Sequence, residues 1–423
     1  MIRVVFFIFG LSVFLNAHTI DELFLALKKH SQTKLDQMSV REAEVARKEI
    51  LSKLYPEVNL FGTYDNYSDP TNLLPVTPQE SATFRDPSIP QPFGDDIYRV
   101  GVKFSMPVFV KSLYTMSDKA KLLKRSAKAK KEINLLQNEA LIVASDVNMI
   151  YLEKALVAIK SKKKSLLESK KNTLIKVKTG RVAPSALFKI EDALNQIEIS
   201  KNNILMQKQK LISTIKTLTG ITLKRSVKLN QTKTLKRDKM GILKPLRVKL
   251  KAQKMDLKSQ KEMFYPSVTA HGSYTYSKTQ AYNNGKDASE NYSDIGLSVN
   301  IPILNFSQNQ SIQKSKVKLV KNRLELQKQK DELTAQADML IKTLSLVKKS
   351  LKYAKKNIKN KKRLLKIAKV SYENETLTTE EYLRYENDVV DAKVNFYKLY
   401  AKRWETLMQL AVIYTNNIEE MVK

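Results

Sequence analysis

A ten-residue phrase occurs twice in this sequence, and its repetition restricts the fold more than any other feature. The stretch YPEVNLFGTY at residues 55–64 returns as YPSVTAHGSY at residues 265–274, an offset of 210. Further along, GVKFSMP matches GLSVNIP and VAPSALFKIEDAL matches LTTEEYLRYENDV, both at an offset of 195. Because the match continues over most of the chain, we expect two copies of one structural unit.

Four segments of about ten residues alternate apolar and polar side chains, which predicts strands with two different faces. Tyrosines gather at the ends of these segments, as in the aromatic girdles of membrane barrels. A soluble sheet with one wet face has the same alternation, so both interpretations stand on this pattern alone. The positions expected to face lipid are Val58, Leu60, Val102, Phe104, Val268, Leu297 and Val299. The positions expected to face a lumen are Asn59, Thr63, Lys103, Thr269, His271 and Ser298.

Four strands are too few to close a barrel, and open sheet edges are not tolerated in lipid. A membrane barrel therefore requires several chains. Two chains give eight strands, whose interior is filled by side chains, whereas three give twelve and leave a lumen. The polar inner positions favour the trimer.

Two long segments, residues 111–178 and 307–372, contain no proline or glycine and carry apolar residues at steps of three and four. This spacing predicts helices with coiled-coil seams, each roughly 100 Å long at 1.5 Å per residue. Each segment ends at an equivalent break, residues 179–184 and 374–379, after which a second helix returns. The breaks are therefore expected to be the tips of helical hairpins.

The tips contain the candidate docking and gating residues. Gly180 suits a helix C-terminus and Pro184 the first turn of the next helix, while Thr378 and Glu381 have capping-box spacing. The charged residues beside the tips close an entrance in one interpretation and only compensate the helix dipole in the other. The predicted tip residues are Gly180, Arg181, Val182, Pro184, Asn374, Leu377 and Thr378. The candidate gating residues are Glu380, Glu381 and Arg384.

Residues 1–17 have a basic start, an apolar run and a small residue at the end, which predicts a secretory signal peptide. The net charge of +33 is spread along helical segments in a chain expected to leave the cytoplasm, so we expect no nucleic-acid partner. The chain has no cysteine, and its three histidines are isolated. We therefore expect no catalytic, cofactor or metal site. The proline-rich stretch 69–96 is expected to be an irregular, exposed loop outside the cell.

Together, the paired YPxVxxxGxY and GxxxxxP strands, the two long helices and the tip GRVAPSAL resemble the TolC family of outer-membrane efflux proteins over about residues 19–415. The resemblance implies a homotrimer with a twelve-stranded barrel in outer-membrane lipid that continues as a helical tunnel through the periplasm of a Gram-negative cell. It also implies that the tips dock to a periplasmic adaptor protein and an inner-membrane pump of the resistance-nodulation-division or ABC type. The implied function is export of small toxic molecules, namely drugs, detergents or metal ions.

Two alternatives remain at this point: a conduit for type I protein secretion, and a periplasmic coiled-coil scaffold without a pore. All three interpretations describe a mainly helical fold with two internal repeats and no enzyme activity. The predicted segments begin with the signal peptide 1–17 and end with a tail at 416–423. Repeat 1, at 18–220, contains the hairpin 55–107 and the helices 111–178 and 184–219. After a linker at 221–240, repeat 2, at 241–415, contains the hairpin 265–303 and the helices 307–372 and 378–415.

Overall fold

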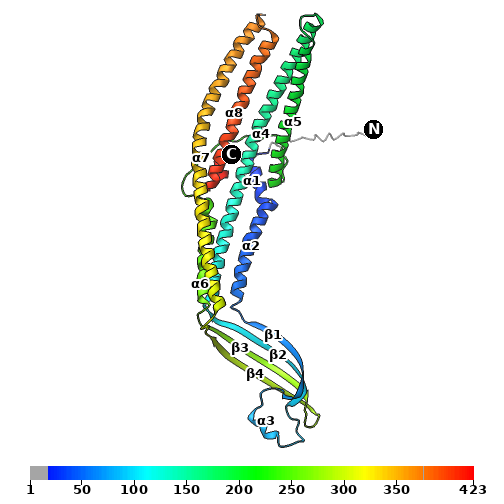
Figure 1. Cartoon of the computed structure of the whole chain (residues 1–423), viewed down its shortest axis with the longest axis vertical. Helices are drawn as coiled ribbons and strands as arrows, with labels where there is room; N and C mark the ends of the chain where they lie inside the picture. The colour runs from blue at the N-terminus through cyan, green and yellow to red at the C-terminus, as the bar shows by residue number, and fades with distance from the viewer. Residues whose placement is uncertain (1–17, 375) are drawn as a thin grey trace, which may run out of the picture. The chain divides into compact units, whose positions relative to one another are not determined.

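The computed structural model of the chain describes residues 18–374 and 376–423 (Figure 1). The predicted signal peptide, residues 1–17, lies outside the described residues. The helices are α1 Ile20–Lys29, α2 Ser31–Ser52, α3 Pro78–Thr83, α4 Lys111–Lys178, α5 Ser185–Thr219, the short 3₁₀ helix η1 Gly241–Leu243, α6 Lys244–Glu262, α7 Phe306–Glu373, α8 Thr379–Ile413 and α9 Ile418–Met421. The strands are β1 Glu57–Asn72, β2 Phe93–Val110, β3 Ser267–Gln280 and β4 Asp287–Asn300. None of the described helices is both long and apolar enough to cross a membrane.

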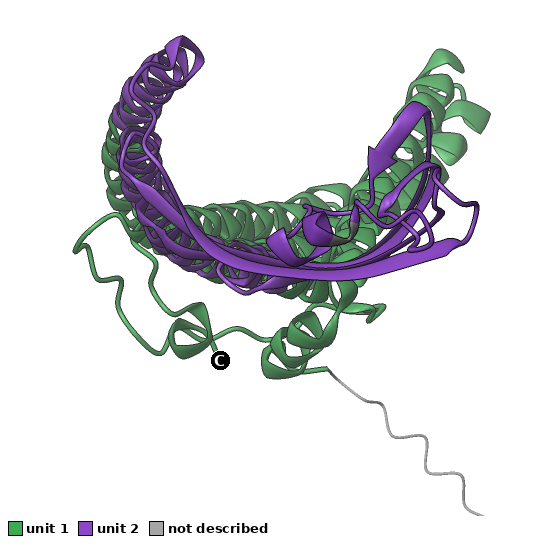
Figure 2. Ribbon diagram, turned by 90° about the horizontal axis from the view of Figure 1, so that it is seen from below, with its two compact units in different colours: residues 1–38, 129–244, 328–423 green, residues 39–128, 245–327 purple. Residues whose placement is uncertain are grey.

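The chain divides into two compact units, which Figure 2 colours green and purple. Unit 1 comprises Met1–Met38, Ala129–Lys244 and Lys328–Lys423, and its described part is helical apart from the linker and the chain end. Unit 2 comprises Ser39–Lys128 and Pro245–Gln327 and contains all four strands. Each unit therefore takes segments from both halves of the sequence.

The seams of the two long helices are buried where the heptad pattern predicts. In α4, Val143 and Val147 are fully buried, and in α7 Ala337 and Leu340 are 1% and 4% exposed. Both helices run for 68 residues because no proline removes a hydrogen bond and no glycine lowers helix propensity within them. The long helices of the predicted fold class are thus present.

Polar contacts fix the order of the four hairpin helices in unit 1. Lys163 of α4 pairs with Glu198 of α5 at 2.5 Å, and Lys162 of α4 pairs with Asp391 of α8 at 2.9 Å. Lys361 of α7 pairs with Asp388 of α8 at 2.7 Å. The helices therefore lie side by side in the order α5, α4, α8, α7, with each 68-residue helix next to a 35-residue partner.

Helix α1, the linker and α9 pack on these helices, and together they form the largest core of unit 1. Phe24 of α1 and Trp404 of α8 are each 1% exposed within it. The linker 221–240 runs beside the chain end, where Asn230 and Lys423 exchange two backbone hydrogen bonds of 2.7 and 3.0 Å. This segment is therefore tied to the helices rather than free.

The four strands of unit 2 form one antiparallel sheet in the order β1-β2-β3-β4, seen as a curved layer in Figure 2. Pro56 and Pro266 each stand one residue before a strand, where the preceding helix has ended. The strands contain 14 to 18 residues rather than the ten expected, because backbone pairing continues past the alternating segments. The β2 register shifts between Pro107 and Phe109, since proline has no N–H to donate to the ladder.

Candidate functional site

The sheet register places the two sets of strand residues selected from the sequence on opposite faces. Val58 pairs with Phe104, which pairs with Gly272, whereas Asn59 pairs with Lys103. Because side chains alternate along each strand, these pairings assign each strand residue to one of the two faces of the sheet. One face, called the apolar face here, carries Val58, Leu60, Val102, Phe104, Val268, Leu297 and Val299. The other, called the polar face, carries Asn59, Thr63, Lys103, Thr269, His271 and Ser298. Which face meets lipid stays a prediction.

The apolar face is open in the single chain. Leu60 is 78% exposed, Leu297 71% and Ile295 83%. A contiguous apolar surface of this kind marks contact with a partner or with a membrane. The sheet order also leaves β1 and β4 each with a neighbouring strand on one side only.

The polar face carries local hydrogen bonds and a contact between a cation and an aromatic ring. The Thr63 hydroxyl donates to Asp65 at 3.3 Å, and Ser298 donates to the backbone carbonyl of Thr269 at 3.4 Å. The ammonium of Lys103 lies 5.7 Å from the centre of the Phe61 ring, which is within cation-π range. The polar face is thus suited to contact with water.

The first tip is a helix C-terminus closed by a Schellman motif. Gly180 has φ of +70°, its N–H donates to the Val177 carbonyl at 3.0 Å, and the Arg181 N–H donates to the Lys176 carbonyl at 2.9 Å. Pro184 occupies the N-cap position of α5, one residue earlier than the first-turn position predicted. Val182 lies between these two ends.

The second tip has one of the two hydrogen bonds of this motif, although the sequence has no glycine between Ser371 and Thr378. The Thr376 N–H donates to the Ser371 carbonyl at 2.9 Å, and these residues lie 195 positions after the first-tip pair. The Asn374 N–H donates to Val370 at 3.0 Å. Leu377 then leads into the N-cap Thr378. The repeat seen in the sequence therefore extends to backbone hydrogen bonds.

Thr378 and Glu381 form the capping box that their spacing indicates. The Thr378 hydroxyl accepts from the Glu381 N–H at 3.3 Å, and the Glu381 carboxylate accepts from the Thr378 N–H at 3.0 Å. The Thr378 N–H and hydroxyl hold the pKa of Glu381 below its ordinary value, so this carboxylate is charged at neutral pH. Glu381 thus has a local structural role in addition to its proposed gating role.

The other candidate gating residues lie beside the capping box. Glu380 and Arg384 line a hollow of about 360 Å³, together with Lys162 and Asn387. Within the described part of this chain, Arg181 forms no ion pair with Glu380 or Glu381. An ion pair that joins Arg181 to Glu380 or Glu381 is thus not found among the described residues, and a gating role stays a prediction.

Sequence reasoning missed an aromatic contact across the second tip. The rings of Tyr372, at the end of α7, and Tyr382, at the start of α8, stack with centroids 4.9 Å apart. The corresponding positions of the first repeat, 195 residues earlier, are Val177 and Leu187. The two tyrosines, ten positions apart across the second break, were therefore the available signal that α7 and α8 meet here.

Sequence reasoning also missed two carboxylates of α4 that hold the linker. Asp146 is fully buried and accepts from the Val227 N–H at 2.8 Å, and burial raises the pKa of Asp146 to about 7. Glu153 accepts from the Ser226 N–H at 3.1 Å and from Lys208 at 3.0 Å. Although partial burial opposes the effect, the hydrogen bonds from Lys208 and Ser226 lower the pKa of Glu153. The two carboxylates thus bind adjacent residues of the linker, and the pKa of one is raised while the pKa of the other is lowered.

Among residues 18–374 and 376–423, no three His, Asp or Glu side chains gather as metal ligands would. The chain has no cysteine to supply thiolate ligands.

Comparison with known proteins agrees with this geometry. Residues 243–413 match the family described as "Outer membrane efflux protein", and no curated protein sequence matches the chain. Among solved structures, the Campylobacter jejuni CmeC outer membrane channel is 16% identical, with a TM-score of 0.72 over 93% of this chain and 84% of that chain. The Vibrio cholerae outer membrane protein VceC is 12% identical, with a TM-score of 0.69 over 93% of this chain and 96% of that chain. The open state of the Neisseria gonorrhoeae MtrE outer membrane channel is also 12% identical, with a TM-score of 0.69 over 93% and 88%.

The fold and the matched domain together define the class: the chain has the architecture of an outer membrane efflux protein. The solved structures with which it shares this fold are outer membrane channels. The fold expected from the resemblance is confirmed, and residues 243–413 match the family of outer membrane efflux proteins.

Proposed function

We propose that the protein is a trimeric outer-membrane channel that exports small toxic molecules, such as drugs, detergents or metal ions, as the outer part of a three-component pump. One observation carries the proposal: the sheet has an exposed apolar face, an opposite polar face and two edge strands without outer neighbours. In lipid, such a sheet is stable only when its edges are paired.

The topology supports closure by identical copies. β1 and β4 run antiparallel to each other, because each strand in the order β1-β2-β3-β4 is antiparallel to the next. Placing β4 of one chain beside β1 of another therefore continues an antiparallel sheet. Three copies give twelve strands and leave a lumen lined by the polar faces.

The helix tips support the proposed partners. The described residues of both tips, Gly180 to Pro184 together with Asn374, Thr376, Leu377 and Thr378, are exposed or half-buried at the ends of helical hairpins. We assign these ends to docking with a periplasmic adaptor, through which an inner-membrane pump of the resistance-nodulation-division or ABC type supplies the energy.

Two measurements test the proposal. Native mass spectrometry of the mature protein in detergent is expected to give a trimer, and planar bilayers are expected to show discrete channels. Deletion of the gene is expected to raise sensitivity to toxic small molecules. A monomer that stays soluble without detergent would contradict the proposal and favour the periplasmic scaffold.

Type I protein secretion remains the second candidate, because a conduit for protein has the same architecture. In that case, deletion would remove a specific protein from the culture medium and leave sensitivity to small molecules unchanged. The comparison of secreted proteins with drug and metal sensitivity in one deletion strain separates the two functions.

A further inference from the structure

The connection between β1 and β2, residues 73–92 and called the cap here, is folded rather than irregular. Its ends meet, since the Leu73 N–H donates to the Pro92 carbonyl at 2.9 Å. Inside it, α3 begins with a capping box between Thr77 and Glu80. The expectation of an irregular loop over 69–96 is therefore wrong: strands β1 and β2 include its two ends, and the residues between them contain α3.

The cap packs against the polar face of the sheet. Leu73 is 1% exposed and forms a small core with Ile97, which is fully buried, and with Ala281 and Ala288. Ile97 is two residues from Arg99 on β2, and Arg99 pairs with Thr63, so all three share the polar face. The apolar contact thus lies on the face that carries Lys103 and His271 rather than on the apolar face.

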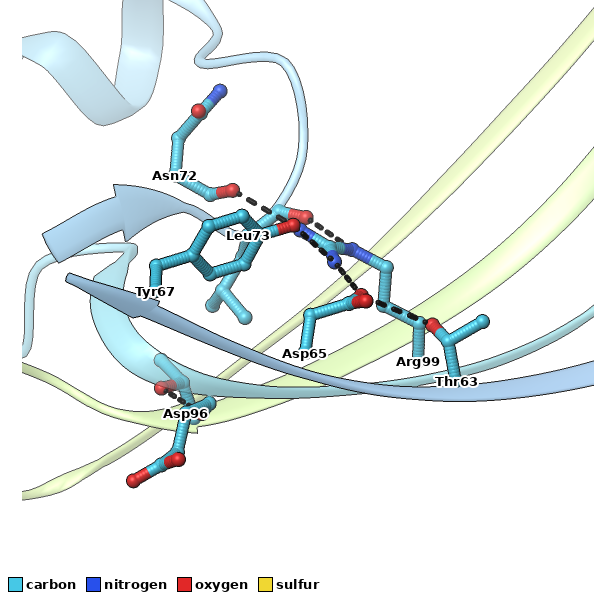
Figure 3. Close-up of polar contacts among 8 residues, drawn as sticks. Thr63, Asp65, Tyr67, Asn72, Leu73, Asp96 and Arg99 are labelled. Carbon is cyan, nitrogen blue, oxygen red and sulfur yellow. Dashed lines mark hydrogen bonds and ion pairs between the residues drawn. The ribbon is translucent and has the colours of Figure 1, made fainter. Parts of the chain in front are cut away.

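Arg99 anchors the start of the cap, as Figure 3 shows. Its guanidinium donates to the backbone carbonyls of Asn72 at 3.4 Å and Leu73 at 3.3 Å, and to the Asp65 carboxylate at 2.8 Å. The Arg99 side chain is 19% exposed. One side chain of the sheet therefore holds both a neighbouring strand and the first cap residue.

The turn between β3 and β4 holds the other side of the cap. The Asn283 amide donates to the Ile89 carbonyl at 3.0 Å, and its oxygen accepts from the Gln91 N–H at 3.1 Å. The Asn284 amide donates to the Ser88 carbonyl at 3.3 Å. The cap is thus attached at two sites that are distant in sequence.

We propose that the cap is a constriction of the channel that limits the size of what passes, and that Arg99 is its positioning residue. This inference rests on the proposed function, since it requires the polar faces to line a lumen. In a closed barrel with that orientation, each chain places its cap inside the lumen at the end where β1 and β2 are connected. Pore width at such a constriction decides which molecules pass.

The test compares the full-length trimer with an Arg99→Met variant in planar bilayers. The variant keeps a long side chain but loses the four hydrogen bonds from Arg99 to Asp65, Tyr67, Asn72 and Leu73. We expect its single-channel conductance to rise roughly twofold and larger polyethylene glycols to enter the pore. Lys103→Met is the matched control, because it removes the same charge from the same face of the same strand without touching the cap.

A second variant keeps the inference testable if Arg99→Met does not assemble. Residues 74–91 are replaced by Asn-Gly, a short turn that suits the closely spaced Leu73 and Pro92. This variant is expected to show at least the increase seen for Arg99→Met. Channels of unchanged conductance and polymer cutoff in the shortened variant would overturn the inference. If the wild-type protein forms no channels at all, the proposed function fails instead.

Discussion

The imidazole of His271 on β3 lies across Gly296 of β4, its direct partner in the sheet. A Cβ placed on Gly296 would come within 2.9 Å of His271 Nε2. Phe104 covers Gly272 in the same way, since a Cβ placed on Gly272 would come within 2.5 Å of the edge of the Phe104 ring. An aromatic ring above a cross-strand glycine shields the backbone and pins the register of the pair. His271 is thus a packing residue as well as a polar one.

Adding a methyl group at Gly296 is therefore expected to destabilise the sheet. We expect Gly296→Ala to lower stability by about 1–3 kcal/mol, the usual range for overpacking. The double variant Gly296→Ala with His271→Ser is expected to recover part of this loss, because the smaller side chain makes room. Thermal dissociation of the trimer in detergent measures both. Purely additive effects of the two substitutions would show that the ring contact is not responsible.

The two faces of the sheet are expected to differ in their tolerance of charge. Arginine at Leu60 or Leu297 on the apolar face should impair membrane assembly by about 2–4 kcal/mol, the cost of a charge at the bilayer midplane. Arginine at Thr63 or Ser298 on the polar face should be tolerated. Heat-resistant trimer in isolated outer membranes is the readout. Equal loss at both pairs of positions would mean that the faces are assigned wrongly.

Docking can be tested by a substitution at Gly180 in the first tip. Gly180 has a positive φ, and no atom lies within 4 Å of an added Cβ. Gly180→Val therefore introduces backbone strain without a clash, on the order of 1–2 kcal/mol. We expect the trimer to form and export to fail. Gly285→Val is the matched control, since Gly285 has φ of +68°, equally free surroundings and a place in the β3–β4 turn. Intact export by the Gly180 variant would remove the tip from the docking site.

The acidic residues after the second tip test gating. Glu381→Gln keeps an acceptor for the Thr378 N–H, so it removes charge while retaining the capping contact. Together with Glu380→Gln it should raise single-channel conductance, since a closed entrance held by charge would loosen. Unchanged conductance with normal insertion would leave these carboxylates as helix-capping residues only.

Asp146 makes stability depend on pH. Its ordinary pKa of 3.8 is raised to about 7 by burial, so the folded state binds a proton that the unfolded state has lost. Stability from this group is fully present below pH 4 and falls as pH rises towards 7. Relative to wild type, Asp146→Asn should therefore gain about 2–3 kcal/mol between pH 5 and pH 8.

Glu153→Gln is the control for Asp146→Asn, because Glu153 binds the neighbouring linker residue and its pKa shifts in the opposite direction. The pKa of Glu153 is lowered, so its charged form stabilises the fold above its unfolded pKa, and the variant should lose stability at pH 8. Chemical unfolding at the two pH values measures the differences. The same pH response from both variants would contradict the assigned protonation states.

The sequence by itself determined the repeat, the long helices and the alternation of the strands, because these follow from local rules. Val143 and Val147 are buried as the heptad spacing predicts, and Thr378 and Glu381 form the capping box that their separation indicates. Side-chain period and capping act over a few residues, so they can be read from neighbours in the chain.

Only the tertiary structure decided which distant groups meet. The contact of Arg99 with Leu73, the position of His271 over Gly296 and the burial of Asp146 against Val227 each depend on strand register or helix docking. A register shift of one residue would reverse every side chain of a strand, and no local pattern specifies such long-range pairing. The cap was therefore expected to be an exposed loop, although its Leu73 enters a core formed by residues 24 to 215 positions away.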